Sequence, residues 1–336
     1  MRTRTFVATT GQGIGLAESN SDVSWAVDSR LADQDVRCLA ADPMNSDTVY
    51  AGTQGNGVLR SNDRGKTWQS AGLNGGIVKA IAVSPLERET VYAGTKPPQL
   101  FVSRDGGISW NELPALRRLR SWWWFQPAEM PITPFVQAIA LSPTDPRIIV
   151  VGMEGNAVVR TEDGGQTWTR HRPGAVRDCH SMTFHATNGD WVYESGGTGV
   201  AVSRDAGKTW KQPRAGMGRR YGWACAADPT QPEIWYVSVS PMIVLSNPIT
   251  PAAHIDGKAH GYIYRSAGGA PWQKLGGGLP QPLNYMAYAL LTDPSMPGHL
   301  YAGLSNGDVW HSTNYGDVWQ QLPFNLKGIH RTLIML

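Results

Sequence analysis

Short runs of β-branched and aromatic residues recur along the whole chain, and turn-forming residues separate them. A typical group occupies 36–43, 48–53 and 57–61, with Gly, Pro, Asn and Asp at its borders. Runs of this kind predict strands joined by tight turns. No segment of useful length shows the apolar spacing of an amphipathic helix. The pattern therefore predicts an all-β protein.

Each group of runs is followed by a recurring octapeptide that ends in Trp. The four clear copies are Ser61–Trp68, Ser103–Trp110, Thr161–Trp168 and Ser203–Trp210, and three weaker copies are Glu18–Trp25, Ser266–Trp272 and Ser312–Trp319. The period is forty-odd residues, and the Trp of each copy opens a fourth β run. Four strands per unit at this period indicate the blades of a β-propeller. Seven copies predict seven four-stranded antiparallel blades.

The two ends of the chain predict how the ring of blades closes. The first unit begins at Thr5–Thr10, which matches the second strand of the other units, so this unit lacks a first strand. The segment His330–Leu336 aligns with the first strand at Arg37–Pro43. Pairing of the two end segments would remove an exposed sheet edge. We therefore expect residues 1–336 to form a single closed propeller domain.

Composition and charge narrow the class of protein further. The 336 residues are 41% hydrophobic, which is enough to fill a core. No apolar run approaches the roughly 20 residues that cross a bilayer, and residues 1–16 lack the pattern of a secretory signal. A net charge of +3 without a basic cluster argues against a nucleic-acid partner. We expect a cytoplasmic protein in which Cys38, Cys179 and Cys225 are reduced thiols.

The octapeptide resembles the Asp-box, or BNR, repeat of sialidase-like propellers, and the resemblance covers nearly the whole chain. In the clear copies the aspartate can accept turn N–H groups, the glycine two positions later tolerates positive φ, and the Trp buries an apolar face. The aspartates are Asp63, Asp105, Asp163 and Asp205. We interpret them as structural, because equivalent copies around a ring serve a turn and not one reaction.

The resemblance implies several classes of function. Asp-box propellers include sialidases, endoglucanases with paired aspartates, sortilin-type receptors, and photosystem II assembly factors that bind protein. The Arg-Ile-Pro segment of the sialidases is absent from this sequence, and seven blades exceed their usual six. Both points argue against a sialidase, although Arg331, Arg37 and Arg220 could imitate its arginine triad. Fold alone does not choose among these classes.

Two departures from the repeat period mark candidate binding loops. They are the insertions 111–135, between two blades, and 241–260, between a second and a third strand. Both are expected on the face opposite the octapeptides, and loops on a rigid scaffold commonly carry function. The first contains Trp122, Trp123 and Trp124, which either contact a ligand or partner or fold back as a plug. Simple tolerance of long loops is the alternative.

Alignment of the first strands predicts one residue per blade at the mouth of the central channel. These residues are Arg37, Lys79, Gln137, His180, Trp223, Tyr288 and Arg331. In ring order the cations fall on adjacent blades and the aromatic residues on the remaining arc. Guanidinium groups bind carboxylates and phosphates bidentately, and the aromatic arc suits a ring or a sugar face. The alternative is a water-filled channel with an ordinary polar lining.

Enzymatic and metal-dependent alternatives use other side chains on the same face. Glycoside hydrolysis needs two carboxyls about 5 to 10 Å apart, and the candidate catalytic residues are Asp35, Asp178, Glu154, Glu194 and His180. Four histidines could meet at a metal only through folding, because no local ligand motif is present; they are His180, His254, His260 and His330. We expect no metal and no cofactor.

The sequence favours a binding protein over an enzyme and leaves catalysis undecided. The expected ligand is a small anionic, aromatic or carbohydrate molecule, or a protein segment. It would bind at the channel mouth, on the insertion-bearing face. A glycoside hydrolase, or another small-molecule enzyme that uses loop carboxylates or His180, is the alternative.

Overall fold

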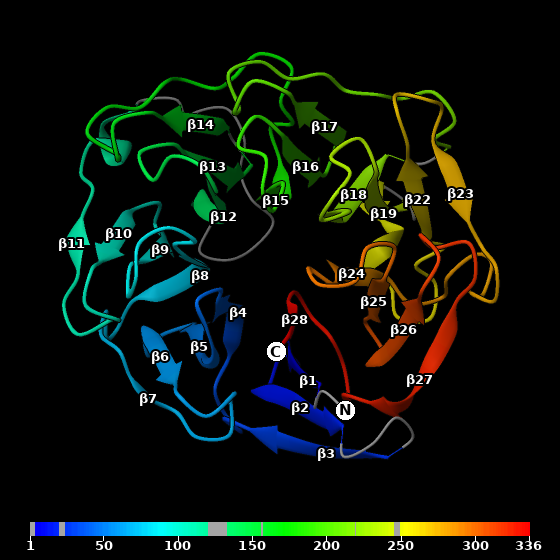
Figure 1. Cartoon of the computed structure of the whole chain (residues 1–336), viewed down its shortest axis with the longest axis horizontal. Coiled ribbons are helices and arrows are strands. Elements are labelled where there is room, and N and C mark those ends of the chain that lie inside the picture. The colour runs from blue at the N-terminus through cyan, green and yellow to red at the C-terminus, as the bar shows by residue number, and fades with distance from the viewer. Residues whose placement is uncertain (1–3, 20–23, 120–132, 156, 219, 245–248) are drawn as a thin grey trace.

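The protein is a ring of seven antiparallel β-sheets around a central channel (Figure 1). The computed structural model describes residues 4–19, 24–119, 133–155, 157–218, 220–244 and 249–336. Each sheet is one blade, and the chain passes once around the ring, so neighbouring blades are consecutive in sequence. The prediction of an all-β, seven-bladed propeller is confirmed.

The strands of each blade run outwards from the channel. Blade 1 has β28 (Leu333–Met335), β1 (Thr5–Thr9), β2 (Ile14–Ser19) and β3 (Trp25–Arg30); blade 2 has β4 (Val36–Asp42), β5 (Asn45–Thr53), β6 (Val58–Ser61) and β7 (Gln69–Ser70); blade 3 has β8 (Ile77–Val83), β9 (Val91–Lys96), β10 (Leu100–Ser103) and β11 (Asn111–Glu112). Blade 4 has β12 (Phe135–Leu141), β13 (Ile149–Glu154) and β14 (Val158–Thr161).

The second half of the ring follows the same order. Blade 5 has β15 (Cys179–Phe184), β16 (Val192–Gly196) and β17 (Gly199–Ser203); blade 6 has β18 (Tyr221–Ala227), β19 (Trp235–Ser240), β22 (Tyr262–Ser266) and β23 (Gln273–Leu275); blade 7 has β24 (Ala287–Thr292), β25 (Leu300–Leu304), β26 (Asp308–Ser312) and β27 (Gln320–Asn325). Outside the blades lie the hairpin of β20 (Met242–Val244) and β21 (Ile249–Pro251) and the short 3-10 helices η1 (Leu116–Arg118) and η2 (Ala252–His254).

The outermost strand of blades 4 and 5 is reduced to isolated contacts within the described residues. In blade 4 the Thr169 N–H donates to the Arg160 carbonyl at 2.8 Å. In blade 5 only Val202 and Lys211 form a two-residue bridge. Pro213 follows two positions later, and because proline has no N–H it cannot extend that ladder. The four-stranded pattern of the family of blades therefore persists here only as single hydrogen-bonded contacts.

The ring closes where the C-terminal strand pairs with the N-terminal blade. In this antiparallel pair Phe6 lies opposite Met335 and Ala8 lies opposite Leu333. Phe6 and Leu333 are also buried in one apolar cluster with Tyr301 of blade 7, so closure joins the cores of adjacent blades. The predicted pairing of the two end segments is confirmed.

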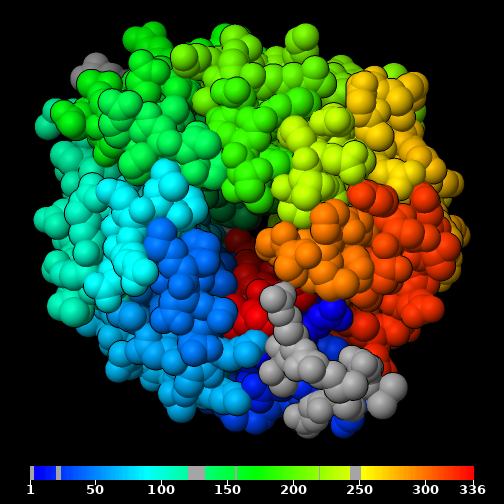
Figure 2. Space-filling view, viewed as in Figure 1, coloured from blue at the N-terminus to red at the C-terminus, as the bar shows by residue number. Residues whose placement is uncertain are grey.

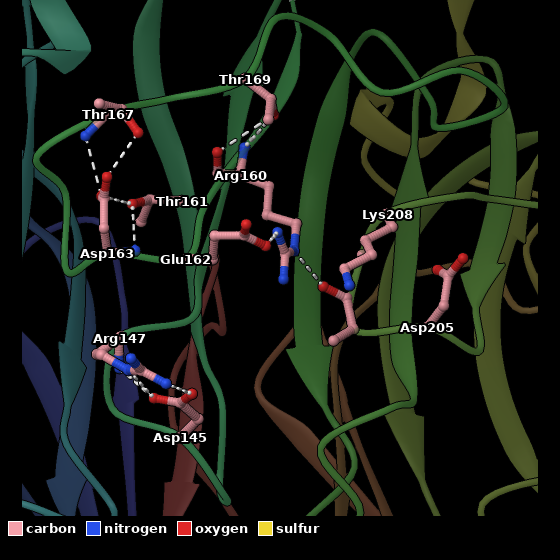
Figure 3. Close-up of polar contacts among 12 residues, drawn as sticks. Asp145, Arg147, Arg160, Thr161, Glu162, Asp163, Thr167, Thr169, Asp205 and Lys208 are labelled. Atoms are coloured by element: carbon pink, nitrogen blue, oxygen red, sulfur yellow. Dashed lines mark hydrogen bonds and ion pairs between the residues drawn. The ribbon is translucent and has the colours of Figure 1, made fainter.

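The octapeptide turns share one set of hydrogen bonds, which Figure 3 shows for the copy in blade 4. The Thr161 hydroxyl donates to Asp163 Oδ1 at 2.7 Å and accepts the Gly165 N–H at 3.0 Å. The Thr167 N–H and hydroxyl donate to the two Asp163 oxygens at 2.9 and 2.6 Å. Hydrogen bonds from Thr167 and Thr161 lower the pKa of Asp163 to about 2. Gly165 needs its φ of +93°, which suits glycine.

The weaker copy in blade 7 shows which part of this turn is essential. Asn314 replaces the aspartate, and its Oδ1 still accepts the Ser312 hydroxyl and the Val318 N–H, each at 2.9 Å. The Trp319 indole still donates to the Gly316 carbonyl at 2.8 Å. One oxygen acceptor is therefore sufficient for the turn, and a full negative charge is not required.

Arginines tie alternate blades to the turn of the next blade. Arg160 Nε donates to the Ala206 carbonyl at 2.7 Å, and its side chain also pairs with Glu162 (Figure 3). The equivalent contacts are Arg60 to the Gly106 carbonyl at 3.1 Å and Arg265 to the Tyr315 carbonyl at 2.9 Å. These contacts connect blades 2 and 3, 4 and 5, and 6 and 7, so the blades are fixed relative to one another around the channel.

Two further features bear on the setting of the protein. The three cysteines are buried free thiols. In the part of the chain that the structure describes, no helix is long and apolar enough to cross a membrane.

We predict that Asp163→Asn and Asp163→Ala differ in stability. Asparagine keeps one oxygen for the Thr167 N–H, as Asn314 does in blade 7, whereas alanine leaves the turn donors without an acceptor. The melting temperature should fall by a few degrees in Asp163→Ala and by less in Asp163→Asn. Equal losses in the two variants, measured by thermal unfolding at pH 7, would show that the charge itself holds the turn.

Candidate functional site

A β-bulge occurs at the same place in the first strand of six blades. The strand pairing skips one residue in five of these strands and two residues, Trp223 and Ala224, in β18. The single skipped residues are Arg37, Lys79, Gln137, His180 and Tyr288. A bulge redirects the side chain of the extra residue. The same irregularity thus presents one side chain per blade at the channel.

The bulged residues and Arg331 meet around one cavity of about 240 Å³. Figure 2 shows the ring from one side, with a hollow at its centre. All seven residues predicted for the channel mouth line this cavity. The structure therefore brings the predicted set together, and their role in binding stays a prediction.

The cationic side chains lie on three consecutive blades. Arg331 precedes β28, Arg37 is in β4 and Lys79 is in β8. Arg37 forms an ion pair with Asp35. Lys79 is only 2% exposed, and its Nζ lies 4.4 Å from the centre of the Phe135 ring, a cation–π contact that partly offsets the cost of burying its charge. These contacts make one side of the cavity rich in positive charge.

The opposite side of the cavity is aromatic. The rings of His180 and Trp223 are 4.5 Å apart, and the Trp223 and Tyr288 rings are 4.7 Å apart. Tyr221 lies 5.0 Å from His180 and completes the group. Such a wall suits a flat apolar group, because offset and edge contacts between rings are favourable.

The insertion 241–260 is attached to this wall by a chain of hydrogen bonds. The Tyr221 hydroxyl donates to His254 Nε2 at 2.7 Å, and His254 Nδ1–H donates to the Tyr288 hydroxyl oxygen at 2.9 Å. The Tyr288 hydroxyl donates in turn to the Ala253 carbonyl at 3.1 Å. Desolvation lowers the pKa of His254 to about 4, which agrees with the neutral imidazole that this chain requires. His254 thus joins the insertion to two channel residues.

His180 is fixed by its neighbours on both sides. Its Nδ1 lies 2.7 Å from the Gly222 carbonyl, and its Nε2 lies 3.6 Å from Asp178 Oδ2. Gln137 donates to the His180 carbonyl at 3.2 Å. Burial lowers the pKa of the His180 ring, and the Asp178 carboxylate opposes that effect in part. Of the candidate catalytic carboxylates, Asp178 therefore lies beside a histidine that lines the cavity.

The remaining candidate carboxylates have different environments. Asp35 is held by Arg37, and Glu154 ends β13. Glu194 was expected on the loop-bearing face, but it lies inside β16 with no exposed surface, so it does not reach a ligand in the channel. Its Oε2 accepts the Val176 N–H at 2.8 Å, and burial raises the pKa of Glu194 to about 8.

Several predicted residues do not join the cavity. Arg220 lines a separate small hollow with Gln212 and Met217, so it does not form a triad with Arg331 and Arg37. Trp122, Trp123 and Trp124 lie outside the described residues.

The four candidate metal ligands are likewise placed apart in function. His330 packs over Gly11, and both nitrogens of His254 are used by Tyr221 and Tyr288. Together with His180 and His260 they form no cluster: within the described ranges no group of three or more His, Cys, Asp or Glu side chains could hold a metal.

Sequence reasoning missed two contributors to the site. Tyr221 was recognised only as part of a basic and aromatic segment, and His254 only as a metal candidate. Their hydrogen bond spans 33 residues and depends on how the insertion folds. The alternation of β18 could have indicated Tyr221, because it lies two residues before Trp223 and shares its face. No local signal marks His254.

The fold and the cavity define a seven-bladed β-propeller with a lined channel mouth. The DUF6242 beta propeller domain matches residues 2–240, and the chain belongs to this family. No curated protein matches the sequence.

Similar solved structures show the same fold. The GH74 xyloglucanase from Xanthomonas campestris has a TM-score of 0.70 and 19% identity, over 94% of this chain and 52% of that protein. An ancestral GH74 enzyme has a TM-score of 0.64 and 20% identity, over 90% of this chain and 38% of that one. YCF48 bound to D1 peptide has a TM-score of 0.57 and 14% identity, over 85% and 80%. The chain thus spans about half, or less, of the GH74 enzymes.

We predict that Glu194 makes the stability of the protein depend on pH. Its folded pKa of about 8 is above the ordinary value of 4.5, so the folded state binds the extra proton. The stabilisation is complete below pH 4.5 and is lost as pH rises towards 8, by up to about 1.4 kcal/mol per pH unit. Urea unfolding of the wild type and of Glu194→Gln at several pH values should show this slope only in the wild type. The same slope in both proteins would assign it to another group.

Proposed function

We propose that the protein binds a small anionic ligand with a flat part at the channel mouth. The observation that carries this proposal is the convergence of seven side chains, one from each blade, on one cavity. Arg331, Arg37 and Lys79 supply charge-assisted donors for an anion. Trp223 and Tyr288 supply apolar surface for a ring or a sugar face. A mostly apolar concavity with a few placed polar groups is typical of a ligand site.

We further propose that the octapeptide turns are Asp-boxes of the BNR type and that both insertions lie on the face of the binding site. Two features support this assignment: the shared hydrogen bonds of the turns, and the attachment of His254 to Tyr221 and Tyr288 at the channel. The free, buried cysteines agree with a reducing compartment. The cytoplasmic location stays a prediction.

Two other occupants of the same cavity define the alternatives. A protein segment is one, because YCF48, a propeller of this fold, is known bound to D1 peptide. A glycoside substrate is the other, because GH74 enzymes share the fold and Asp178 lies beside His180. Asp35 and Asp178 would be the acid and base in that case.

We predict that Arg37→Ala and Trp223→Ala remove ligand binding. Each variant deletes one side of the cavity, the charge or the aromatic surface, and should lower affinity for an anionic ligand at least about tenfold. A screen of metabolites, oligosaccharides and peptides by thermal shift, followed by calorimetry, gives the measurement. Arg104→Ala is the matched control, because Arg104 is exposed on an octapeptide turn and pairs with Glu87. An equal loss of binding in the control would contradict the proposed location.

The hydrolase alternative has its own test in the same protein. Hydrolysis of a glycoside by the wild type that disappears in Asp178→Asn or Asp35→Asn would replace the binding proposal with an enzymatic one. Background turnover in all three proteins supports binding without catalysis.

A further inference from the structure

Two hydrogen-bond acceptors face each other at the edge of the cavity. His180 Nδ1 lies 2.7 Å from the Gly222 carbonyl, and this geometry requires the proton on Nδ1. Nε2 therefore presents a lone pair. It lies 3.6 Å from Asp178 Oδ2, which is beyond hydrogen-bond length and is itself an acceptor. Among the described residues no donor satisfies Nε2, so this point of the site can take a donor from a ligand.

The surroundings of the acceptor pair favour a donor with positive charge. Asp178 is a carboxylate whose Oδ1 accepts the Gly155 N–H at 3.1 Å, while its side chain remains 33% exposed. The Trp223 and Tyr221 rings lie 4.5 and 5.0 Å from the His180 ring. Aromatic faces attract cations, and a charged donor strengthens a hydrogen bond to a carboxylate. A protonated amine meets all of these conditions.

The cationic side of the cavity lies across the ring from this point. His180 belongs to blade 5 and Arg37 to blade 2, which is as far apart as two blades can be in a ring of seven. The cavity of about 240 Å³ touches both residues. One small molecule can therefore contact both sides through two groups of opposite charge.

We propose that the channel mouth binds a dipolar ligand with an anionic group and a protonated amine. The anionic group contacts Arg331, Arg37 and Lys79, and the amine lies between His180 Nε2 and Asp178 Oδ2. The flat part of the ligand packs against Trp223. This inference rests on the function proposed above and adds the second polar group of the ligand. Amino acids with a flat side chain belong to this chemical class.

Three matched probes separate the two charged groups. L-Phenylalanine carries both, hydrocinnamate lacks the amine, and phenethylamine lacks the carboxylate. Calorimetry at pH 7 on the full chain should show L-phenylalanine binding at least about tenfold more tightly than either of the other two.

Asp178→Asn tests the amine position in particular. Asparagine keeps an oxygen for the Gly155 N–H, and its amide nitrogen can donate to His180 Nε2, so the variant satisfies the acceptor from within the protein. We expect its melting temperature to be no lower than that of the wild type. The preference for L-phenylalanine over hydrocinnamate should disappear, while hydrocinnamate binding stays unchanged. Asp28→Asn, on the outer strand of blade 1, is the control and should keep the preference.

Two results would overturn the inference, and they differ in what else they affect. If hydrocinnamate binds the wild type as tightly as L-phenylalanine, or if Asp178→Asn keeps the preference, the amine position is wrong and the anion-binding proposal stands. If none of the three probes binds up to about 10 mM, a range that still detects very weak ligands, both proposals fail for this class of ligand.

Discussion

The strand pairing between Phe6–Ala8 and Leu333–Met335 is the contact on which the whole arrangement depends. Without it, blade 1 would lack its innermost strand and the first and last blades would each expose an open side. With it, the seven first strands form a continuous wall. Arg331 directly precedes the closing strand, so the same contact that completes the ring also places one of the three cations at the cavity.

Within the closed ring, repeated small contacts set the position of each blade. The octapeptide turns fix the link between third and fourth strands by hydrogen bonds from short polar side chains, and Arg60, Arg160 and Arg265 join each such blade to the turn of the next. These contacts lie away from the channel. The division has a physical reason: the turns and the arginines satisfy backbone groups at the outside of the ring, whereas the bulges at the inside leave side chains available to the cavity.

The sequence predicted the architecture because the repeat carries it many times over. The seven copies of the octapeptide, the β runs before them and the partner segment at Thr5–Thr10 each pointed to the same ring, and an error in one copy would not have changed the result. The alignment of first strands also found the seven residues of the cavity, because the bulge sits at the same position in six blades.

Features outside the repeat could not be predicted in this way. The contacts of His254 depend on the path of an insertion that has no counterpart in other blades. Glu194 was placed correctly in sequence, yet its enclosure within β16 depends on how blades 4 and 5 pack, which one sequence does not reveal. The proton on His180 Nδ1 follows from a carbonyl in the neighbouring blade, Gly222, and so became visible only once the blades were side by side.

The bulges have a consequence for how this protein can change over time. A bulged residue takes no part in the pairing register of its strand, so replacing it alters neither the alignment of the sheet nor its hydrogen-bond ladder. The chemistry displayed at the channel is thereby uncoupled from folding. A lineage can exchange Arg37, Gln137 or Tyr288 one at a time and acquire a different specificity on an unaltered frame.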